Sequence, residues 1–259
     1  MKAIILAAGK GERLRPLTSD RPKCLVPFLE KPLLAYQLEA LNQVGIDDIT
    51  IVGGYQCDQL KPYGYPVIEN PDYDTTNMVK SLSKVEPLIA DESEDFLVCY
   101  SDILYEPRLL RCLMEEKKEQ VVLADLAWKQ QWERRFDDPL EDAEVFKMDD
   151  KGHLIQIGQQ PTDLSEIEAQ YIGLCRFSAQ ALRKALQFYA QLSDEEHYDG
   201  KTKKQLDMTR FLQLLIDAGQ LVSVALTKGG WVEFDSIQDL RLYEGLSQKK
   251  TLSCFIELP

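Results

Sequence analysis

Four cationic side chains near the start of the sequence have the chemistry to bind phosphate. They lie close together, at Lys10, Arg13, Arg15 and Lys23, and the first of them is in the middle of the segment Gly9–Gly11. Glycines let the backbone turn tightly and bring bare N–H groups close to an anion. Lysine adds a mobile point charge, and arginine adds a planar fork that matches two phosphate oxygens. This combination suits a triphosphate.

The element that must position this loop is the apolar run that precedes it, Lys2–Ala8. The run is short, continuous and bounded by glycine, which predicts a buried parallel strand. Two well-known phosphate loops do not match the residues after this strand. A P-loop requires serine or threonine after its lysine, but Gly11 follows Lys10. A dinucleotide-binding loop requires a third glycine or alanine where this chain has Leu14.

A longer pattern distinguishes this loop from an ordinary glycine turn with exposed cations. The segment Leu6–Thr18 reads Leu-Ala-Ala-Gly-Lys-Gly-Glu-Arg-Leu-Arg-Pro-Leu-Thr, and Pro22 and Lys23 come after it. This pattern resembles the signature of nucleotidyltransferases, which join a nucleoside triphosphate to a phosphorylated acceptor. The resemblance implies that Lys23 contacts the α-phosphate or the acceptor phosphate, and that Arg13 clamps the β- and γ-phosphates. For either residue alone, the alternative is a solvated surface cation.

The predicted nucleotide site extends beyond the cations to the backbone of the first loop, to a second glycine loop and to the start of a helix. Its residues are Leu6, Ala7, Ala8, Gly9, Gly11, Glu12, Arg13, Lys23, Gly54, Tyr55, Asn77 and Ser81. Asn77 has two interpretations, because an asparagine at a helix start can cap the helix. Its amide can also read a pyrimidine edge, with Ser81 one turn further on the same face.

Two aspartates far apart in the sequence are the candidate metal ligands. Asp102 follows a buried strand, and Asp235 follows the β-like run Trp231–Phe234. The resemblance implies that they converge on one Mg²⁺ ion, which prefers carboxylate oxygens and offsets the repulsion between two reacting anions. The alternative is that each aspartate caps a turn or a helix. The predicted catalytic residues are therefore Lys23, Arg13, Asp102 and Asp235.

The segment Thr76–Leu82 narrows the resemblance. It is similar to that of small cytidylyltransferases that load phosphocholine or related phosphorylated amines. The chain as a whole looks most similar to CTP-dependent enzymes that act on phosphorylated glutamine in bacterial surface-polysaccharide pathways. CTP and a small phosphorylated acceptor, which also includes the aminoethylphosphonate type, are therefore the expected partners.

The acceptor is expected to contact carboxylates and aromatic side chains. Glu144 and Glu168 lie in β-like segments. Glu233 is expected to point to the opposite face of its strand from Phe234, so its side chain could also reach the site. Carboxylates that face Trp128 or Tyr171 would suit an ammonium group, whereas a sugar would favour neutral hydroxyl partners. The alternative for the tryptophan is a partly exposed packing residue.

Strand and helix patterns alternate in the first half of the chain, which predicts a parallel sheet with helices on both faces. The expected strands cover 2–8, 48–52, 66–70 and 95–100, and the expected helices cover 32–44 and 77–88. In the second half we expect strands over 121–128, 143–148, 153–157, 168–177, 221–226 and 229–235, and helices over 182–192, 205–218 and 237–246. The predicted class is α/β, a Rossmann-like three-layer sandwich whose mostly parallel central sheet carries a mixed-sheet acceptor-binding insertion.

Length and charge limit the function further. We expect one nucleotidyltransferase domain over residues 1–259, with a nucleotide-binding half over about 1–105 and an acceptor-binding half over about 106–259 that returns to the metal site. A net charge of −13 argues against non-specific binding of nucleic acid, which needs a basic surface. The first apolar run is too short for a signal peptide, and no apolar stretch is long enough for a membrane span. Six scattered cysteines predict reduced thiols in a cytoplasmic protein, and a homo-oligomer stays open.

Two other functions also stay open at this point. The same reaction on a sugar-1-phosphate would make the protein an NDP-sugar pyrophosphorylase. A catalytically inactive nucleotide-binding regulatory module is the second alternative. Retention of Lys23, Asp102 and Asp235 argues against the inactive module, because a sensor does not need the metal pair.

Overall fold

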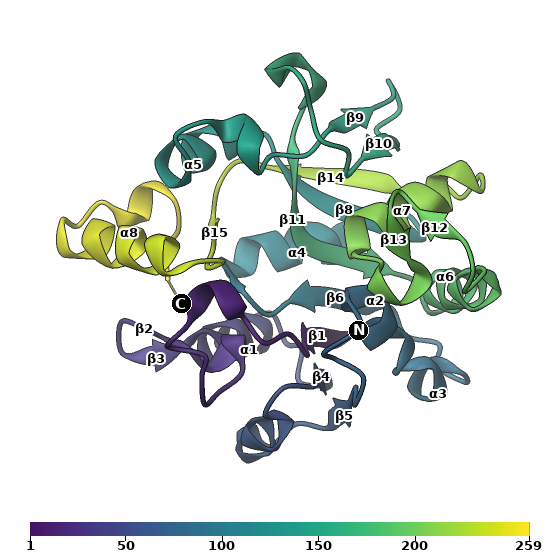
Figure 1. The fold of residues 1–259 in the computed structure, drawn as a ribbon, viewed down its shortest axis with the longest axis horizontal. Helices are drawn as coiled ribbons and strands as arrows, with labels where there is room; N and C mark the ends of the chain where they lie inside the picture. The colour runs from purple at the N-terminus through teal and green to yellow at the C-terminus, as the bar shows by residue number, and fades with distance from the viewer. Residues whose placement is uncertain (259) are drawn as a thin grey trace.

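Residues 1–258, which the computed structural model describes, fold around a seven-stranded central sheet (Figure 1). In spatial order its strands are β14 (Ser223–Thr227), β8 (Gln120–Asp125), β11 (Gln170–Phe177), β6 (Phe96–Tyr100), β1 (Lys2–Ala7), β4 (Ile49–Gly53) and β5 (Val67–Glu69). Six of these strands run in the same direction, and β11 is antiparallel to both of its neighbours. The expected α/β class with a mostly parallel sheet is confirmed.

The first strand shows why this sheet is buried on both faces. Ile4 and Leu6 of β1 point into one apolar cluster, whereas Ala3, Ile5 and Ala7 point into another. All five are at most 6% exposed. A strand covered on both faces needs apolar residues at successive positions, which accounts for the continuous apolar run in the sequence.

Helices cover the two faces of the sheet and form the outer layers of the sandwich. One face packs against α1 (Leu33–Gln43), α4 (Pro107–Glu115) and α5 (Trp128–Arg135). The other packs against α2 (Met78–Ser83), α3 (Glu86–Ile89), α6 (Ala179–Gln191) and α7 (Met208–Asp217). The last helix, α8 (Ile237–Gln248), lies at one side of the molecule over a third, smaller apolar cluster (Figure 1).

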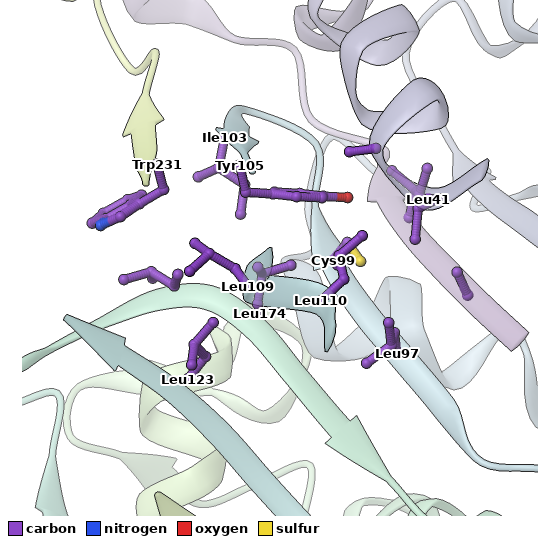
Figure 2. Packing of buried hydrophobic residues seen from close by; sticks show 14 of the residues in the cluster. Leu41, Leu97, Cys99, Ile103, Tyr105, Leu109, Leu110, Leu123, Leu174 and Trp231 are labelled. Atoms are coloured by element: carbon purple, nitrogen blue, oxygen red, sulfur yellow. The ribbon is translucent and has the colours of Figure 1, made fainter. Parts of the chain in front are cut away.

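The larger core joins residues from distant parts of the chain (Figure 2). Leu41 of α1 and Leu110 of α4 pack against Leu97 of β6, and all three are fully buried. Burying one such side chain contributes about 1.5–3 kcal/mol. This core therefore fixes the strands whose carboxyl ends carry the candidate site.

Four antiparallel pairs lie outside the central sheet. They are β2 (Pro27–Phe28) with β3 (Lys31–Pro32), β7 (Ile103–Tyr105) with β15 (Trp231–Glu233), β9 (Phe146–Met148) with β10 (Leu154–Ile157), and β12 (His197–Tyr198) with β13 (Lys201–Thr202). Of these, β7 and β15 matter most for the site, because they join the two halves of the chain.

The helix expected over residues 77–88 is wrong as a single element. It is two helices, α2 and α3, with a break after Ser83. Pro87 is the second residue of α3, and a proline has no N–H for the bond that would continue the preceding helix. The sequence pattern predicts the helical residues correctly, and Pro87 accounts for the break between the two helices.

The strand expected over 121–128 ends earlier, at Asp125, and Trp128 instead begins α5. Asp125 ends the strand because its carboxylate accepts hydrogen bonds from the backbone N–H groups of Ala127 (2.7 Å) and Gly229 (3.0 Å). Trp128 is 5% exposed, and its ring lies edge-on to Trp132 at 5.8 Å within the core. The packing interpretation of this tryptophan is therefore the one that the structure supports.

No helix within residues 1–258 is both long enough and apolar enough to cross a membrane. The six cysteines are all free, and four of them are buried.

Candidate active site

The loop after β1 packs against the short helix that begins at Lys23. Gly11 has a φ of 62°, in the left-handed region that favours glycine. A Cβ atom at this position would lie 2.9 Å from the Cβ atom of Lys23 and 3.1 Å from Cγ2 of Thr18. The Thr18 hydroxyl donates a hydrogen bond to the Gly11 carbonyl (2.8 Å) and holds the turn. Glycine is therefore required here for Lys23 to lie against the loop.

Lys23 is held between the two predicted metal ligands. Its Nζ atom lies 2.7 Å from Oδ2 of Asp102 and 2.7 Å from Oδ1 of Asp235. Arg13 forms an ion pair with the second carboxylate of the pair, that of Asp235. The structure thus brings together all four residues that the sequence predicted as catalytic.

The strand pair β7–β15 explains how two aspartates so far apart in sequence become neighbours. Glu233 pairs with Ile103 at the end of the ladder. One residue further, the backbone N–H of Phe234 donates to the carbonyl of Asp102 at 2.8 Å. Asp235 comes directly after it, so the register of this antiparallel pair places its carboxylate beside that of Asp102.

Burial and charge oppose each other in this cluster. Burial alone would lower the pKa of Lys23, but the carboxylates of Asp102 and Asp235 outweigh it and raise that pKa above its ordinary value. Burial would raise the pKa of Asp235, yet Lys23 and Arg13 hold that pKa below its ordinary value. Lys23 and Asp235 therefore both keep their charge at neutral pH.

A cavity of about 370 Å³ opens beside this cluster at the carboxyl ends of β1 and β6. Of the predicted nucleotide-binding residues, it is lined by Leu6, Ala8, Gly9, Gly11, Glu12, Arg13, Lys23, Asn77 and Ser81. Asp102 and Asp235 line it as well. Its further lining residues are Tyr73, Thr76, Met78 and Ser101.

Three predicted nucleotide-binding residues do not line this cavity. The side chain of Ala7 points into the core on the opposite face of β1. Gly54 lies under the loop, and a Cβ atom there would come within 2.6 Å of Tyr73 Cβ. Tyr55 donates its backbone N–H to the Ala8 carbonyl (3.1 Å). Gly54 and Tyr55 therefore support the loop from behind.

Asn77 caps a helix, as one of its two interpretations has it, and the reading of a pyrimidine edge stays a prediction. Its Oδ1 atom accepts the backbone N–H of Met78 at 2.8 Å, so it caps α2 while it lines the cavity. Ser81 accepts a hydrogen bond from Nδ2 of Asn70 at 3.0 Å, which fixes its hydroxyl on the cavity wall.

A second cavity of about 210 Å³ adjoins the first, since Met78 and Asp235 line both. Five carboxylates line it: Asp142, Glu144, Asp207, Glu233 and Asp235. Four aromatic side chains also contribute, from Tyr100, Trp132, Tyr171 and Trp231. No lysine or arginine is among the lining residues in the described part of the chain. Asp235, Glu233 and Asp207 each pair with a cation outside this lining, whereas Asp142 and Glu144 form no ion pair within residues 1–258. The wall is therefore acidic and aromatic.

Glu144 is the most strongly perturbed of the acids that are not paired with a cation here. Burial, reinforced by the nearby carboxylate of Asp207, raises the pKa of Glu144 to about 7. The Thr209 hydroxyl donates to it at 3.2 Å. Burial also raises the pKa of Asp142. Such shifts are typical of carboxylates whose counter-charge is absent until a ligand binds.

The predicted acceptor residues divide between this cavity and other places. Glu144, Tyr171 and Glu233 line it. Trp128 is in the core, and Glu168 is exposed, with Oε2 accepting the backbone N–H of Met148 at 2.9 Å. The structure does not bring these two side chains to the cavity.

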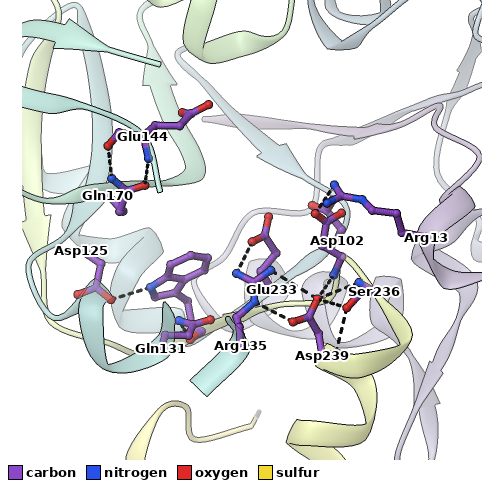
Figure 3. Close-up of polar contacts among 12 residues, drawn as sticks. Arg13, Asp102, Asp125, Gln131, Arg135, Glu144, Gln170, Glu233, Ser236 and Asp239 are labelled. Carbon is purple, nitrogen blue, oxygen red and sulfur yellow. Dashed lines mark hydrogen bonds and ion pairs between the residues drawn. The ribbon is translucent and has the colours of Figure 1, made fainter. Parts of the chain in front are cut away.

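The side chain of Arg135 is fully buried. It lies between Glu233 and Asp239 (Figure 3), at 2.7 Å and 2.8 Å respectively. Asp239 in turn accepts the backbone N–H groups of Asp235 (3.0 Å) and Ser236 (2.8 Å). Arg135 thus connects the acidic cavity to the backbone of a predicted metal ligand.

Comparison with known proteins identifies the family of this chain. A family model described as a MobA-like NTP transferase domain matches residues 3–191. The chain belongs to this family. It is 40% identical over 250 residues to the CTP:phosphoglutamine cytidylyltransferase of Campylobacter jejuni subsp. jejuni serotype O:2, which covers 93% of this chain and 98% of that protein.

Two solved structures resemble this transferase over nearly their full length. One is the CTP:phosphocholine cytidylyltransferase from Streptococcus pneumoniae, with a TM-score of 0.67, 25% identity, and coverage of 95% of this chain and 98% of that one. The other is the inositol-1-phosphate CTP transferase from T. maritima, with a TM-score of 0.71, 22% identity, and coverage of 99% and 97%. The similarity to the T. maritima structure shows a shared fold alone. The Rossmann-like architecture is thereby confirmed, and the protein is a nucleotidyltransferase.

The donor set of this nucleotidyltransferase fits a divalent metal. Asp102 Oδ1 is buried and has no hydrogen-bond partner within residues 1–258, which leaves one oxygen free to act as a ligand. Protein side chains alone do not form a complete cage, since no group of three or more metal-binding side chains occurs among these residues. Mg²⁺ commonly binds through one or two carboxylates, with water and substrate phosphates as its other ligands.

Two acidic residues of the second cavity escaped prediction for identifiable reasons. Asp207 reads as a helix cap, and it does accept the backbone N–H of Arg210 at 2.8 Å. Asp142 lies in the acidic run Asp137–Glu144, which resembles a solvated loop. Neither pattern reveals that the chain folds both residues against the same cavity.

Proposed function

We propose that this protein is an Mg²⁺-dependent cytidylyltransferase that transfers CMP from CTP to a small phosphorylated amine or amino acid. The observation that carries the proposal is the position of Lys23 between Asp102 and Asp235, at the junction of the two cavities. Positive charge and two candidate metal ligands therefore surround one point, where a transferring phosphorus would lie.

In the proposed reaction, a phosphate oxygen of the acceptor forms a bond to the α-phosphorus of CTP. The bond between the α-phosphorus and the bridging oxygen breaks, and pyrophosphate leaves with that electron pair. Lys23 neutralises charge on the α-phosphate, and Arg13 holds the leaving phosphates with its planar fork. A bound Mg²⁺ supplies further neutralisation of the phosphate oxygens, and Asp102 and Asp235 would hold it.

The nucleotide end of the proposal rests on the first cavity. The glycine loop after β1 lines it, and backbone N–H groups in such a loop can bind a phosphate. Asn77 and Ser81 lie on the wall, where an amide and a hydroxyl can read a base edge. The relatives from Campylobacter jejuni and Streptococcus pneumoniae are both named as CTP-dependent, which supports cytidine as the base.

The acceptor end rests on the second cavity. Two carboxylates without an ion pair within residues 1–258, Asp142 and Glu144, and four aromatic rings favour a positively charged group. An acceptor with an ammonium group, such as phosphocholine, phosphorylated glutamine or aminoethylphosphonate, meets this requirement. A sugar-1-phosphate has no positive charge to offer, so the acidic wall argues against the NDP-sugar alternative. The buried, unsatisfied oxygen of Asp102 argues against an inactive regulatory module.

Pyrophosphate release tests the proposal. CTP, UTP, dTTP and GTP should each be combined with phosphocholine, phosphorylated glutamine, aminoethylphosphonate and glucose-1-phosphate in the presence of Mg²⁺. We expect release with CTP and at least one of the three amine acceptors. Release with glucose-1-phosphate alone would favour the sugar enzyme, and no release with any pair would favour the regulatory module. Use of the CDP-linked product in surface polysaccharide, a cytoplasmic location and a homo-oligomer stay predictions.

A further inference from the structure

A third cavity, of about 750 Å³, lies at the opposite edge of the central sheet from the two catalytic cavities. Gln120, the first residue of β8, and Ser223, the first residue of β14, both line it. These strands run in the same direction as β1, whose carboxyl end faces the nucleotide cavity. The third cavity is therefore at the amino ends of the strands, and residues of α6 line it. Helix α6 lies on the other side of the molecule from α8 (Figure 1).

The charge of this cavity is opposite to that of the protein. Lys117, Lys118 and Lys184 line it, and none of the three forms an ion pair in the described chain. Glu119 is the one acidic lining residue. Three lysines against one glutamate leave two net positive charges on the wall of a protein whose net charge is −13. Such a local reversal of charge attracts anions.

The rest of the wall suits a ligand with an apolar part. Leu221 is 70% exposed, more than any other large hydrophobic side chain of residues 1–258, and Phe188 lines the cavity with it. Glutamine amides from α6 and from the turn before β14 provide donors and acceptors around them. Gln120 is 3% exposed, and its amide nitrogen has no hydrogen-bond partner within the same residues.

We propose that this cavity is a second ligand site, which binds a phosphorylated small molecule that carries a ring. A phosphate monoester has a charge close to −2 at neutral pH, which matches the two net positive charges of the wall. The cavity volume lies within the range of about 300–1,000 Å³ that small-molecule sites occupy. The ring lies against Phe188 and Leu221, and the lysines hold the phosphate. The proposal does not depend on the proposed function.

Titration calorimetry with 1-naphthyl phosphate tests this site on the full chain. The cavity variant carries Lys117→Gln, Lys118→Gln and Lys184→Gln together. Its matched control carries Lys228→Gln, Lys249→Gln and Lys250→Gln, three exposed lysines outside the cavity, and has the same net charge. We expect the native protein to bind the probe, the cavity variant to lose at least about tenfold in affinity, and the control to change by less than twofold.

Two further measurements locate the binding and identify its apolar part. Leu221→Ser should weaken the binding of 1-naphthyl phosphate but leave the binding of inorganic phosphate unchanged. Lys23→Ala should leave the binding of 1-naphthyl phosphate at the third cavity unchanged. The proposal is overturned if the native protein does not bind the probe, if the two triple variants bind it equally, or if Lys23→Ala abolishes the binding.

Discussion

Lys23 neutralises a pair of carboxylates that would otherwise repel each other at close range. It does so while it is almost fully withdrawn from water, since its side chain is 13% exposed. If Mg²⁺ bound to the two aspartates, the Lys23 ammonium would be free to contact phosphate oxygens instead. The same side chain thus stabilises the carboxylate pair and would be available to the substrate.

We expect Lys23→Ala to lower kcat by about a hundredfold or more, because a charge contact made to the transferring phosphate is lost. The measurement is the rate of pyrophosphate release at saturating CTP and acceptor. Lys31→Ala is the control, because that lysine pairs with Glu39 away from both catalytic cavities. A rate near that of the native protein for Lys23→Ala would show that the site is misplaced.

Asp235→Asn should raise the Mg²⁺ concentration needed for half-maximal activity, because an amide oxygen is a weaker ligand than a carboxylate. A titration of pyrophosphate release against Mg²⁺ measures this directly. Asp239→Asn tests whether a shift of the Asp235 backbone alone changes the Mg²⁺ requirement, since Asp239 holds that backbone but does not line either cavity. An unchanged Mg²⁺ requirement in Asp235→Asn would remove this residue from the proposed ligands.

The raised pKa of Glu144 predicts that acceptor binding depends on pH. Its pKa of about 7 lies above the ordinary value, so below pH 7 the folded protein holds a proton on this carboxyl and its charge is lost. A cationic acceptor binds the ionised form better, so kcat/KM for the acceptor should fall as the pH falls through about 7. Glu144→Gln should give a lower value without this inflection.

The acceptor phosphate also titrates in this range, so the difference between the native and Glu144→Gln profiles is the informative quantity. Thr209→Val is a second variant, because it removes only the hydroxyl that hydrogen-bonds the carboxylate. Its inflection should move to higher pH. Identical profiles for the native protein and Glu144→Gln would contradict the assignment.

At the scale of elements, α5, β15 and α8 are joined by buried charge. Arg135 of α5 contacts Glu233 of β15 and Asp239 of the first turn of α8. Asp239 completes a capping box with Ser236, which also fixes where Asp235 leaves the strand. Asp235, the proposed metal ligand, is therefore positioned by three elements from the second half of the chain.

Arg135→Met should lower the free energy of unfolding by about 3–5 kcal/mol, because two buried carboxylates lose their counter-charge. Urea denaturation measures the loss. Arg134→Met is the matched control, because the neighbouring side chain is exposed and has no ion pair within residues 1–258. Equal stability of the two variants would show that the buried network contributes little.

At the scale of the whole molecule, the site depends on one continuous core under the sheet. Leu110 of α4 is fully buried in it, whereas Leu226 of the edge strand β14 is 43% exposed. We expect Leu110→Ala to cost about 2–5 kcal/mol of unfolding free energy, through lost burial and a cavity. Leu226→Ala should change it by no more than about 0.5 kcal/mol. Thermal or urea unfolding compares the two, and a similar loss in both would contradict this picture of the core.

The sequence was informative wherever a local pattern has a single structural meaning. Strand β1 is buried on both faces, which requires an unbroken apolar run, and the turn at Gly11 has a positive φ, which favours glycine. The strand and the turn could therefore be identified from a few consecutive residues. The break between α2 and α3 and the early end of β8 were missed, because they depend on Pro87 and on hydrogen bonds to Asp125. The break between the helices has a local signal in Pro87, whereas the end of β8 depends in part on a contact with the distant residue Gly229.

By itself, the sequence determined the reaction class, the mostly parallel sheet and the identity of four charged residues that meet in space. Only the tertiary structure decided that Trp128 packs in the core, that Asp142 and Asp207 join Glu144 in one acidic wall, and that Arg135 is buried. The reason is physical. A loop that binds phosphate is built from consecutive residues, so its pattern can be read in the sequence. A cavity wall is assembled by strand register and helix packing from distant segments, and no local sequence pattern shows which segments will meet.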